Sequence, residues 1–404
     1  MSIFRMAWRN VWRNRRRTAI TVAAASLALA TMIAYSGLIS GYLLDMEKNI
    51  VDLEIGDLQI AADDYLERPS LYTRIEDHRA LLAVLSEAGY PAAARLEASG
   101  LAAGDKTSAG VRINGVEVER DRGVSSIFEH VARGRWLRPG EKDGAVVGRV
   151  VARVLEVDPG DEILVLSQAA DGSTANALYT VRGVLGAVGD AVDRSGLFLT
   201  AGAFRELMIV PNGAHRVVVR RGQDQSLAAA AREVSELVGG LTVESWRELL
   251  PTLASMLDSA GSAVYVMFML VYVAIGIVIL NAMLMAVFER IRELGVLKAL
   301  GFGPLGVLRL ILAETAIQLA LALVVGGALS LPALCYLASS GIELGEMGGI
   351  AFQGATMAST MRARIEPAIF VGPVVMLVAV VLAAVLYPAL KAALISPVRA
   401  IRHS

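Results

Sequence analysis

Four apolar segments dominate the sequence, over residues 18–44, 260–288, 305–337 and 368–390. Each contains about 20 largely uncharged residues, the length that crosses a hydrocarbon core about 30 Å thick as a helix. Hydrophobic residues make up 55% of the chain, above the roughly 45 to 50% of a soluble domain. The sequence therefore predicts a membrane protein with four transmembrane α-helices.

Charge near the ends of these segments indicates the topology. Residues 1–17 contain no acidic residue and six arginines, Arg5, Arg9, Arg13, Arg15, Arg16 and Arg17. Because basic flanks stay in the cytoplasm, residues 1–17 are expected there. Four crossings then place residues 289–304 and the tail 391–404 in the cytoplasm as well. Residues 45–259 and the loop 338–367 are expected outside.

The N-terminal region allows two interpretations. An arginine-rich start, an apolar run and the small residues Ala28 and Ala30 also fit a cleaved secretory signal. The apolar run continues to Leu44, well past the roughly 7 to 15 residues of a signal core, which favours a retained span. Helical spacing predicts that residues 1–17 form an interfacial helix whose apolar face consists of Phe4, Ala7, Trp8, Val11 and Trp12.

Residues 45–259 alternate strand-like and helix-like patterns, which predicts a large extracytoplasmic α+β domain between the first two membrane helices. Residues 110–119 are expected to form either a strand or a hairpin with Asn114 and Gly115 as its turn. Apolar residues at helical spacing predict stalk helices at both ends of the domain, with possible substrate-facing positions at Met46, Ile50, Leu53, Leu249, Leu253, Met256 and Leu257. The two stalks could pair with each other, or each could pack on its own domain.

The segment 338–367 is rich in glycine and methionine. This composition predicts a flexible external loop, and contact with lipid or substrate at the outer leaflet is the alternative.

The sequence shows no catalytic constellation. The stretch from Gly100 to Ser108 resembles a phosphate loop, but Asp105 stands where a glycine is required and would repel phosphate. The four histidines lack metal-ligand spacing, and the single cysteine, Cys335, excludes a disulfide within the chain. We therefore expect a non-catalytic chain without a cofactor, a metal or a nucleic-acid partner.

Polar residues inside the apolar segments are few. Asn281 and Gln318 are predicted to form interhelical hydrogen bonds. Glu314 is expected to pair with Arg309 or Arg290, because a proton relay needs more titratable partners than these segments offer.

The stretch between the second and third segments carries a recognisable pattern. It reads "ERIRELGVLKALGFGPLGVLRLILAE", and it resembles the same region of ABC transporter permeases of the MacB, LolC/LolE and FtsX type. Three other stretches are similar to these permeases: the arginine-rich start, "GAVVGRVVARVLEVDPGDEI" in the outer domain, and "YPALKAALISPVRAIR" after the last span. The stretch departs from the family pattern at residues 303–306, where polar residues are commoner.

The resemblance implies a multi-pass protein of the bacterial inner membrane. Two such subunits, identical or related, would assemble with a cytoplasmic ABC ATPase dimer, which binds the ATP and Mg. The implied function is to couple ATP hydrolysis to movements of the periplasmic domain, in lipoprotein extraction or related amphiphile transport. The alternatives are regulation of a cell-wall hydrolase, as in FtsX, and efflux of peptides or toxins, as in MacB. Membrane lipid and a lipoprotein or periplasmic partner are the other expected contacts.

The resemblance also assigns a coupling helix to the cytoplasmic region 289–304. Glycines at 295 and 301 are expected to bend the chain, and leucines at 294, 297 and 300 to contact a groove on the ATPase. From periodicity alone, a solvated turn stabilised by its own salt bridges is the alternative. The predicted coupling residues are Arg290, Arg292, Glu293, Leu294, Gly295, Leu297, Lys298, Leu300 and Gly301.

Overall fold

The computed structural model describes residues 3–62, 64–222, 224–343, 351–352, 355–356 and 360–394. The chain divides into two compact units. The helical unit comprises Met1–Leu43, Leu257–Glu343 and Thr360–Ser404, and the α+β unit comprises Leu44–Met256 and Leu344–Ser359. Two unit boundaries fall inside long helices, because α2 (Arg15–Ile50) and α10 (Pro251–Glu289) each contribute residues to both units.

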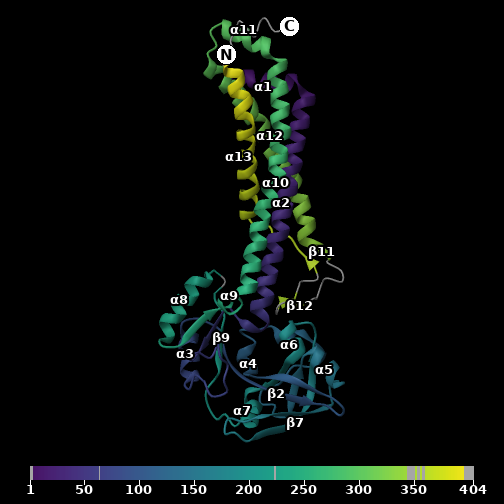
Figure 1. The fold of residues 1–404 in the computed structure, drawn as a ribbon, viewed down its shortest axis with the longest axis vertical. Helices are drawn as coiled ribbons and strands as arrows, with labels where there is room; N and C mark the ends of the chain where they lie inside the picture. Colours follow the sequence, from purple (N-terminus) through teal and green to yellow (C-terminus); the bar gives the residue numbers. More distant parts are fainter. Residues whose placement is uncertain are drawn as a thin grey trace. The chain divides into compact units, whose positions relative to one another are not determined.

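The long helices of the helical unit run side by side (Figure 1). They are α2, α10, α12 (Pro304–Ser339) and α13 (Ala368–Leu394), joined by the shorter α1 (Ile3–Arg13) and α11 (Ile291–Ala299). All four long helices are apolar enough to cross a membrane. The apolar segments found in the sequence lie inside them, and the helices continue beyond, because backbone hydrogen bonding does not stop where side chains become polar.

Close contact between α2 and α12 depends on small residues. The Ser26 hydroxyl donates to the carbonyl of Ala322 at 3.3 Å. A Cβ on Gly326 would lie 2.9 Å from the Ser26 carbonyl oxygen. Such close backbone approach is a common basis of helix association in membranes, so a larger side chain at 326 would push the two helices apart.

The predicted N-terminal helix is present as α1, and its apolar face meets two different environments. The helix breaks at Asn14, so α1 and α2 are separate. Ala7 and Val11 are buried against Leu310 and Ile317 of α12, whereas Phe4, Trp8 and Trp12 are exposed. α1 therefore packs on α12 with one part of its apolar face and leaves the aromatic part of that face exposed.

Part of the segment 338–367 is structured. Strand β11 (Ile342–Glu343) pairs with β14 (Thr360–Met361), and β12 (Ala351–Phe352) pairs with β13 (Ala355–Thr356). After β14, the amide of Arg364 donates to the carbonyl of Gly37 at 3.0 Å. For these residues the expectation of a weakly structured loop is wrong, because backbone hydrogen bonds fix them. Residues 344–350, 353–354 and 357–359 lie outside the described residues.

One mixed sheet organises the α+β unit, in the order β10-β1-β9-β2-β3-β8-β5-β7-β4, with β6 pairing with β2 and β7. Its strands are β1 (Leu58–Ala61), β2 (Ala92–Ala103), β3 (Ser108–Val116), β4 (Val131–Gly134), β5 (Gly144–Val147), β6 (Glu162–Gln168), β7 (Thr174–Leu185), β8 (Gly196–Thr200), β9 (Arg216–Val219) and β10 (Thr242–Ser245). The pairing is mainly antiparallel, with parallel pairs β3–β8 and β5–β7. The α+β pattern read from the sequence therefore agrees with the structure.

Helices pack on this sheet around two apolar clusters. The helices are α3 (His78–Glu87), α4 (Val118–Asp121), α5 (Arg149–Leu155), α6 (Asp190–Ser195), α7 (Ala201–Met208), α8 (Leu227–Val238) and α9 (Trp246–Leu249), with the short turns η1 (Val51–Ile55) and η2 (Ile127–His130). Buried residues of α3 and α8 meet β1 and β9 in one cluster. Buried residues of α5 and α7 meet β3, β6 and β7 in the other.

Of the two predictions for residues 110–119, the strand is confirmed over residues 110–116 and the hairpin turn is wrong, because Asn114 and Gly115 lie inside β3 and pair with Glu97 and Leu96. A Cβ on Gly115 would lie 2.7 Å from the Phe204 side chain. Glycine is therefore required at this position because it leaves space for α7 to pack closely on the sheet, and not because of its φ angle.

Candidate functional site

A short helix, α11, links the ends of α10 and α12. Arg290 leaves the helical conformation before it, with φ −109° and ψ 15°, and Gly301 takes a φ of +94° after it. A glycine in this region ends a helix without strain. Gly295 lies inside α11 and is buried, so the bend predicted there is wrong; the chain turns at Arg290 instead.

The leucines of this stretch do not face one way. Leu294 is buried in the core of the helical unit, and Leu297 packs partly against it. Leu300 is 79% exposed. The prediction that all three leucines form one contact surface is therefore wrong for Leu294, which α11 turns toward its own helices.

The outer face of α11 combines apolar and charged side chains. Its exposed residues are Arg292, Glu293, Val296, Ala299 and Leu300. Positions 292, 296, 299 and 300 follow helical spacing, so they lie together on one face. We call these four residues the outer face of α11.

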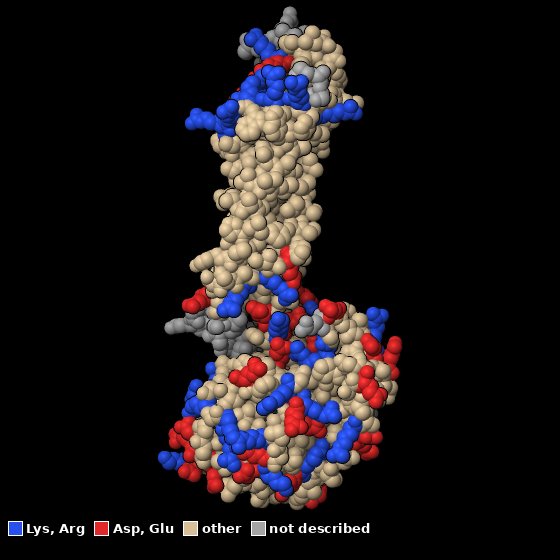
Figure 2. Space-filling model, turned by 180° about the vertical axis from the view of Figure 1, so that it is seen from behind, with Lys and Arg blue, Asp and Glu red and all other residues tan. Residues whose placement is uncertain are grey.

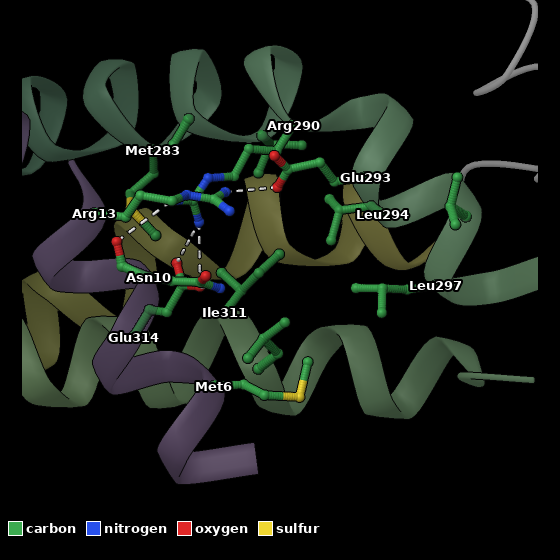
Figure 3. Close-up of a pocket in the computed structure, with 14 residues that line it drawn as sticks. Met6, Asn10, Arg13, Met283, Arg290, Glu293, Leu294, Leu297, Ile311 and Glu314 are labelled. Carbon is green, nitrogen blue, oxygen red and sulfur yellow. Dashed lines mark hydrogen bonds and ion pairs between the residues drawn. The ribbon is translucent and has the colours of Figure 1, made fainter. Parts of the chain in front are cut away.

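A polar junction fixes the start of α11 to two other helices. Arg290 Nη1 lies 3.3 Å from Glu314 Oε1 in α12, and Asn10 Nδ2 of α1 donates to the same oxygen at 2.6 Å. Arg290 Nη2 also donates to the Asn10 carbonyl at 3.4 Å. Of the two partners considered for Glu314, Arg290 is the one in contact. Figure 3 shows these side chains converging from α1, the end of α10 and α12.

Further contacts extend from this junction along α11. Arg13 Nη2 of α1 lies 2.7 Å from Glu293 Oε2. Lys298 Nζ donates to the carbonyl of Ala393 in α13 at 2.5 Å. Through these contacts α11 is connected to α1, α12 and α13, so a displacement of α11 would act on all three helices.

A cavity of about 440 Å³ lies between α1, α10, α11 and α12. Apolar side chains, including Met283, Leu294 and Ile311, form most of its wall (Figure 3). Asn10, Arg290 and Glu314 line it as well. The cavity therefore belongs to the polar junction at the start of α11.

Two predicted polar positions in the membrane helices differ in their surroundings. Gln318 is buried beside Thr21 of α2 and Val381 of α13, as an interhelical group would be. Asn281 is exposed on α10, so the interhelical hydrogen bond predicted for it stays a prediction.

The stalk positions also differ. Leu53 is buried with Val118 and Trp136 of the α+β unit, so for Leu53 the alternative of packing on its own domain is the observed one. Leu253 is buried, whereas Met256 is 41% exposed. Met46, Leu249 and Leu257 are half-buried and Ile50 is buried. Pairing of the two stalks stays a prediction.

Sequence reasoning missed Asn10 and Arg13 as members of the junction. A signal was present, because Asn10 follows Ala7 by three residues and precedes Val11, so it shares the buried stripe of α1. Arg5, Arg9, Arg15 and Arg16 of this region are exposed, and Figure 2 shows basic side chains gathered at the end of the helical unit.

Comparison with known proteins identifies both parts of the chain. The MacB-like periplasmic core domain family matches residues 18–237, more than half of the sequence. The FtsX-like permease C-terminal family matches residues 265–397, which include α11 and most of the polar junction. The comparison with curated proteins gives no significant match.

Solved structures similar to the chain include two extracytoplasmic regions. The periplasmic region of MacB from Actinobacillus actinomycetemcomitans is 12% identical, with a TM-score of 0.36, over 49% of this chain and 91% of that one. The extracellular domain of the noncanonic ABC-type transporter YknZ from Gram-positive bacteria is 16% identical, with a TM-score of 0.33, over 46% of this chain and 98% of that one. On the two family matches, the chain belongs to the MacB/FtsX-type permeases of ABC transporters.

Proposed function

We propose that this chain is an inner-membrane subunit that couples ATP hydrolysis by a separate cytoplasmic ATPase dimer to movements of its periplasmic domain, for the extraction or export of lipoproteins or related amphiphiles. Members of these permease families work with a cytoplasmic ABC ATPase. The proposal places both chain termini and α11 in the cytoplasm, with a second copy or a related permease completing the complex.

The observation that carries the proposal is the division of α11 into two faces. Its inner face, with Leu294 and the contacts of Arg290, is fixed to the other helices. Its outer face, with Val296 and Leu300, is exposed. A helix that is attached on one side and open on the other suits a docking element that transmits movement.

Contacts within the α+β unit support transmission at the other end of α2. Arg220 lies 2.6 Å from Asp52, and Arg221 lies 2.9 Å from Asp57. The Ser125 hydroxyl donates to the carbonyl of Leu53 at 2.7 Å. The end of α2 is thus attached to the sheet by several bonds, so a movement of this helix would move the strands with it.

The polar groups of the membrane helices do not favour ion-driven transport. Glu314 is already engaged by Arg290 and Asn10. Ion-coupled transporters use chains of titratable groups or broken helices near the middle of the membrane. This arrangement favours a role in which work is delivered to the periplasmic domain.

The test uses the full chain co-expressed with its ATPase. Val296→Asp with Leu300→Asp places two charges at exposed positions of the outer face of α11. We expect co-purification of the ATPase to fall at least about ten-fold, the effect of losing about 1.4 kcal/mol of binding. Leu178→Asp is the matched control, since Leu178 is 61% exposed in β7. Unchanged ATPase binding in the double variant would contradict the coupling role.

Depletion of the chain tests the substrate class. Loss of lipoprotein sorting is the expected result. Division or lysis defects with normal sorting would instead indicate regulation of a cell-wall hydrolase.

A further inference from the structure

A polar patch lies in the middle of the sheet of the α+β unit. In antiparallel strands, directly opposed residues share a face. Glu97 opposes Asn114, and Ser99 opposes Arg112, so all four side chains belong to one face of β2 and β3. Such a cluster of charged groups inside a domain is costly unless each charge is compensated.

Compensation is provided by a network around Glu97. Its carboxylate accepts a hydrogen bond from the Tyr65 hydroxyl at 3.2 Å and forms an ion pair with Arg216. Arg216 Nη1 in turn donates to Gln59 Oε1 at 3.1 Å. Burial would raise the pKa of Glu97, but Arg216 and Arg112 outweigh burial and lower the pKa below its usual value. The carboxylate is therefore charged and held in one position.

Two cavities flank this network, of about 360 Å³ and about 480 Å³. Four residues line both: Tyr65, Pro69, Glu97 and Arg112. The smaller cavity continues to Ser99, Ser167, Leu71 and Met208. The larger continues to Gln59, Ile55, Leu249 and Leu250. Together they form a cleft with charged groups at its centre and apolar side chains toward both ends.

The lining disfavours several ligand classes. In the larger cavity the carboxylates of Glu97 and Asp190 balance the guanidinium groups of Arg112 and Arg216, so the lining offers no excess positive charge for a phosphate group. An alkyl chain would remove water from Glu97 and Arg112 without replacing the lost hydrogen bonds. The His215 ring stacks on the Tyr65 ring, with centroids 5.5 Å apart, and so covers one face of it.

A peptide main chain matches the same lining. Each peptide unit offers a carbonyl acceptor and an N–H donor. Arg112 supplies donors and the Glu97 carboxylate supplies acceptors at the centre of the cleft. Leu71 and Met208 at one end, and Ile55 and Leu249 at the other, could receive apolar side chains.

We propose that this cleft binds an extended peptide segment, with Glu97 and Arg112 contacting its main chain and the two apolar ends receiving its side chains. Ile55 is the last residue of η1, which follows α2, and Leu249 ends α9, with only Leu250 between it and the start of α10 at Pro251. A bound peptide would therefore touch the points where both membrane helices join the sheet. The site does not rest on the proposed coupling role of α11.

The test uses the full chain in phospholipid nanodiscs and two dye-labelled heptapeptides, acetylated and amidated. One carries leucines at both ends with serines and glycines between them, and the other contains serine and glycine only. Fluorescence anisotropy should show binding of the first peptide and at least ten-fold weaker binding of the second. Arg112→Gln should weaken binding of the first peptide about ten-fold, the loss of one charge-assisted hydrogen bond.

Two further variants separate binding from folding. Ala191→Trp fills the rim of the larger cavity from an exposed position on α6, and it should also weaken binding. Arg138→Gln, at an exposed site outside the cleft, is the matched control and should bind normally. No binding of the leucine peptide to the wild-type chain, or equal binding by Arg112→Gln, Ala191→Trp and wild type, overturns the proposal.

The assembled complex distinguishes the source of the peptide. A rise in ATP hydrolysis when the leucine peptide is added identifies a transported peptide. Binding without such a rise identifies a segment of a partner protein. Either result supports the proposed peptide-binding cleft.

Discussion

Glu314 in the helical unit and Glu97 in the α+β unit have similar partners in different surroundings. Each carboxylate is held by one arginine, Arg290 or Arg216, and by one neutral donor, Asn10 or Tyr65. The strands around Glu97 are also joined by backbone hydrogen bonds. The helices around Glu314 have their backbone bonds satisfied internally, so side chains alone set their relative positions. The network around Glu314 therefore positions helices, whereas the network around Glu97 shapes a cleft.

The largest expected effect comes from breaking the Arg290–Glu314 pair. Glu314→Leu leaves Arg290 buried without its partner, and we expect a loss of about 3 to 5 kcal/mol in unfolding free energy. Glu314→Leu combined with Arg290→Met should recover most of this loss, since no charge is left buried. Unfolding in detergent measures the free energy of unfolding of the single and the double variant. Equal stability of the single variant and wild type would show that the pair does not position the helices.

A smaller expected effect is the loss of stability of the α+β unit as the pH falls. A hydrogen bond from Arg135 lowers the pKa of Glu141 from 4.5 to about 2, against an opposing contribution from burial. Because the folded-state pKa is lowered, the stabilisation is present above pH 4.5 and is lost as pH falls toward 2. Thermal unfolding of the full chain should show that Glu141→Gln is less stable at neutral pH, with a difference that shrinks below pH 4.5. A difference that is constant over this range contradicts the assignment.

The smallest expected effect is that of the Arg13–Glu293 pair. Both side chains are more than half exposed, and exposed pairs contribute about 0 to 1 kcal/mol. Arg13→Gln should therefore change the unfolding temperature little. Its comparison with Glu314→Leu sharpens the contrast, because both variants remove a contact between α1 and the coupling region. A large destabilisation by Arg13→Gln would mean that the outer contact, and not the buried junction, fixes α1.

The sequence was sufficient for properties that depend on composition and local pattern. The four apolar segments predicted the membrane helices, and the alternation of strand-like and helix-like patterns predicted an α+β domain. Positive φ at Gly301 fits the helix end expected there. Pairing of Glu314 with Arg290 was one of two options, because both arginines lie within reach along the chain.

Properties set by tertiary packing were not predictable. The sequence pair Asn114-Gly115 is typical of a turn, yet the close packing of Phe204 explains the glycine inside β3. Leu294 and Leu300 look equivalent in the sequence, but α11 buries one and exposes the other. The polar cleft also escaped notice, because Tyr65, Glu97, Arg112 and Arg216 are far apart along the chain and the sheet brings them together.

The central claim is that α11 meets the ATPase through its outer face. Photo-crosslinking residues placed singly at 294, 296 and 300 of the full chain test it in the assembled complex. The account predicts adducts with the ATPase from positions 296 and 300, which replace Val296 and Leu300, and none from position 294. An adduct from position 294 with none from 296 or 300 would contradict it.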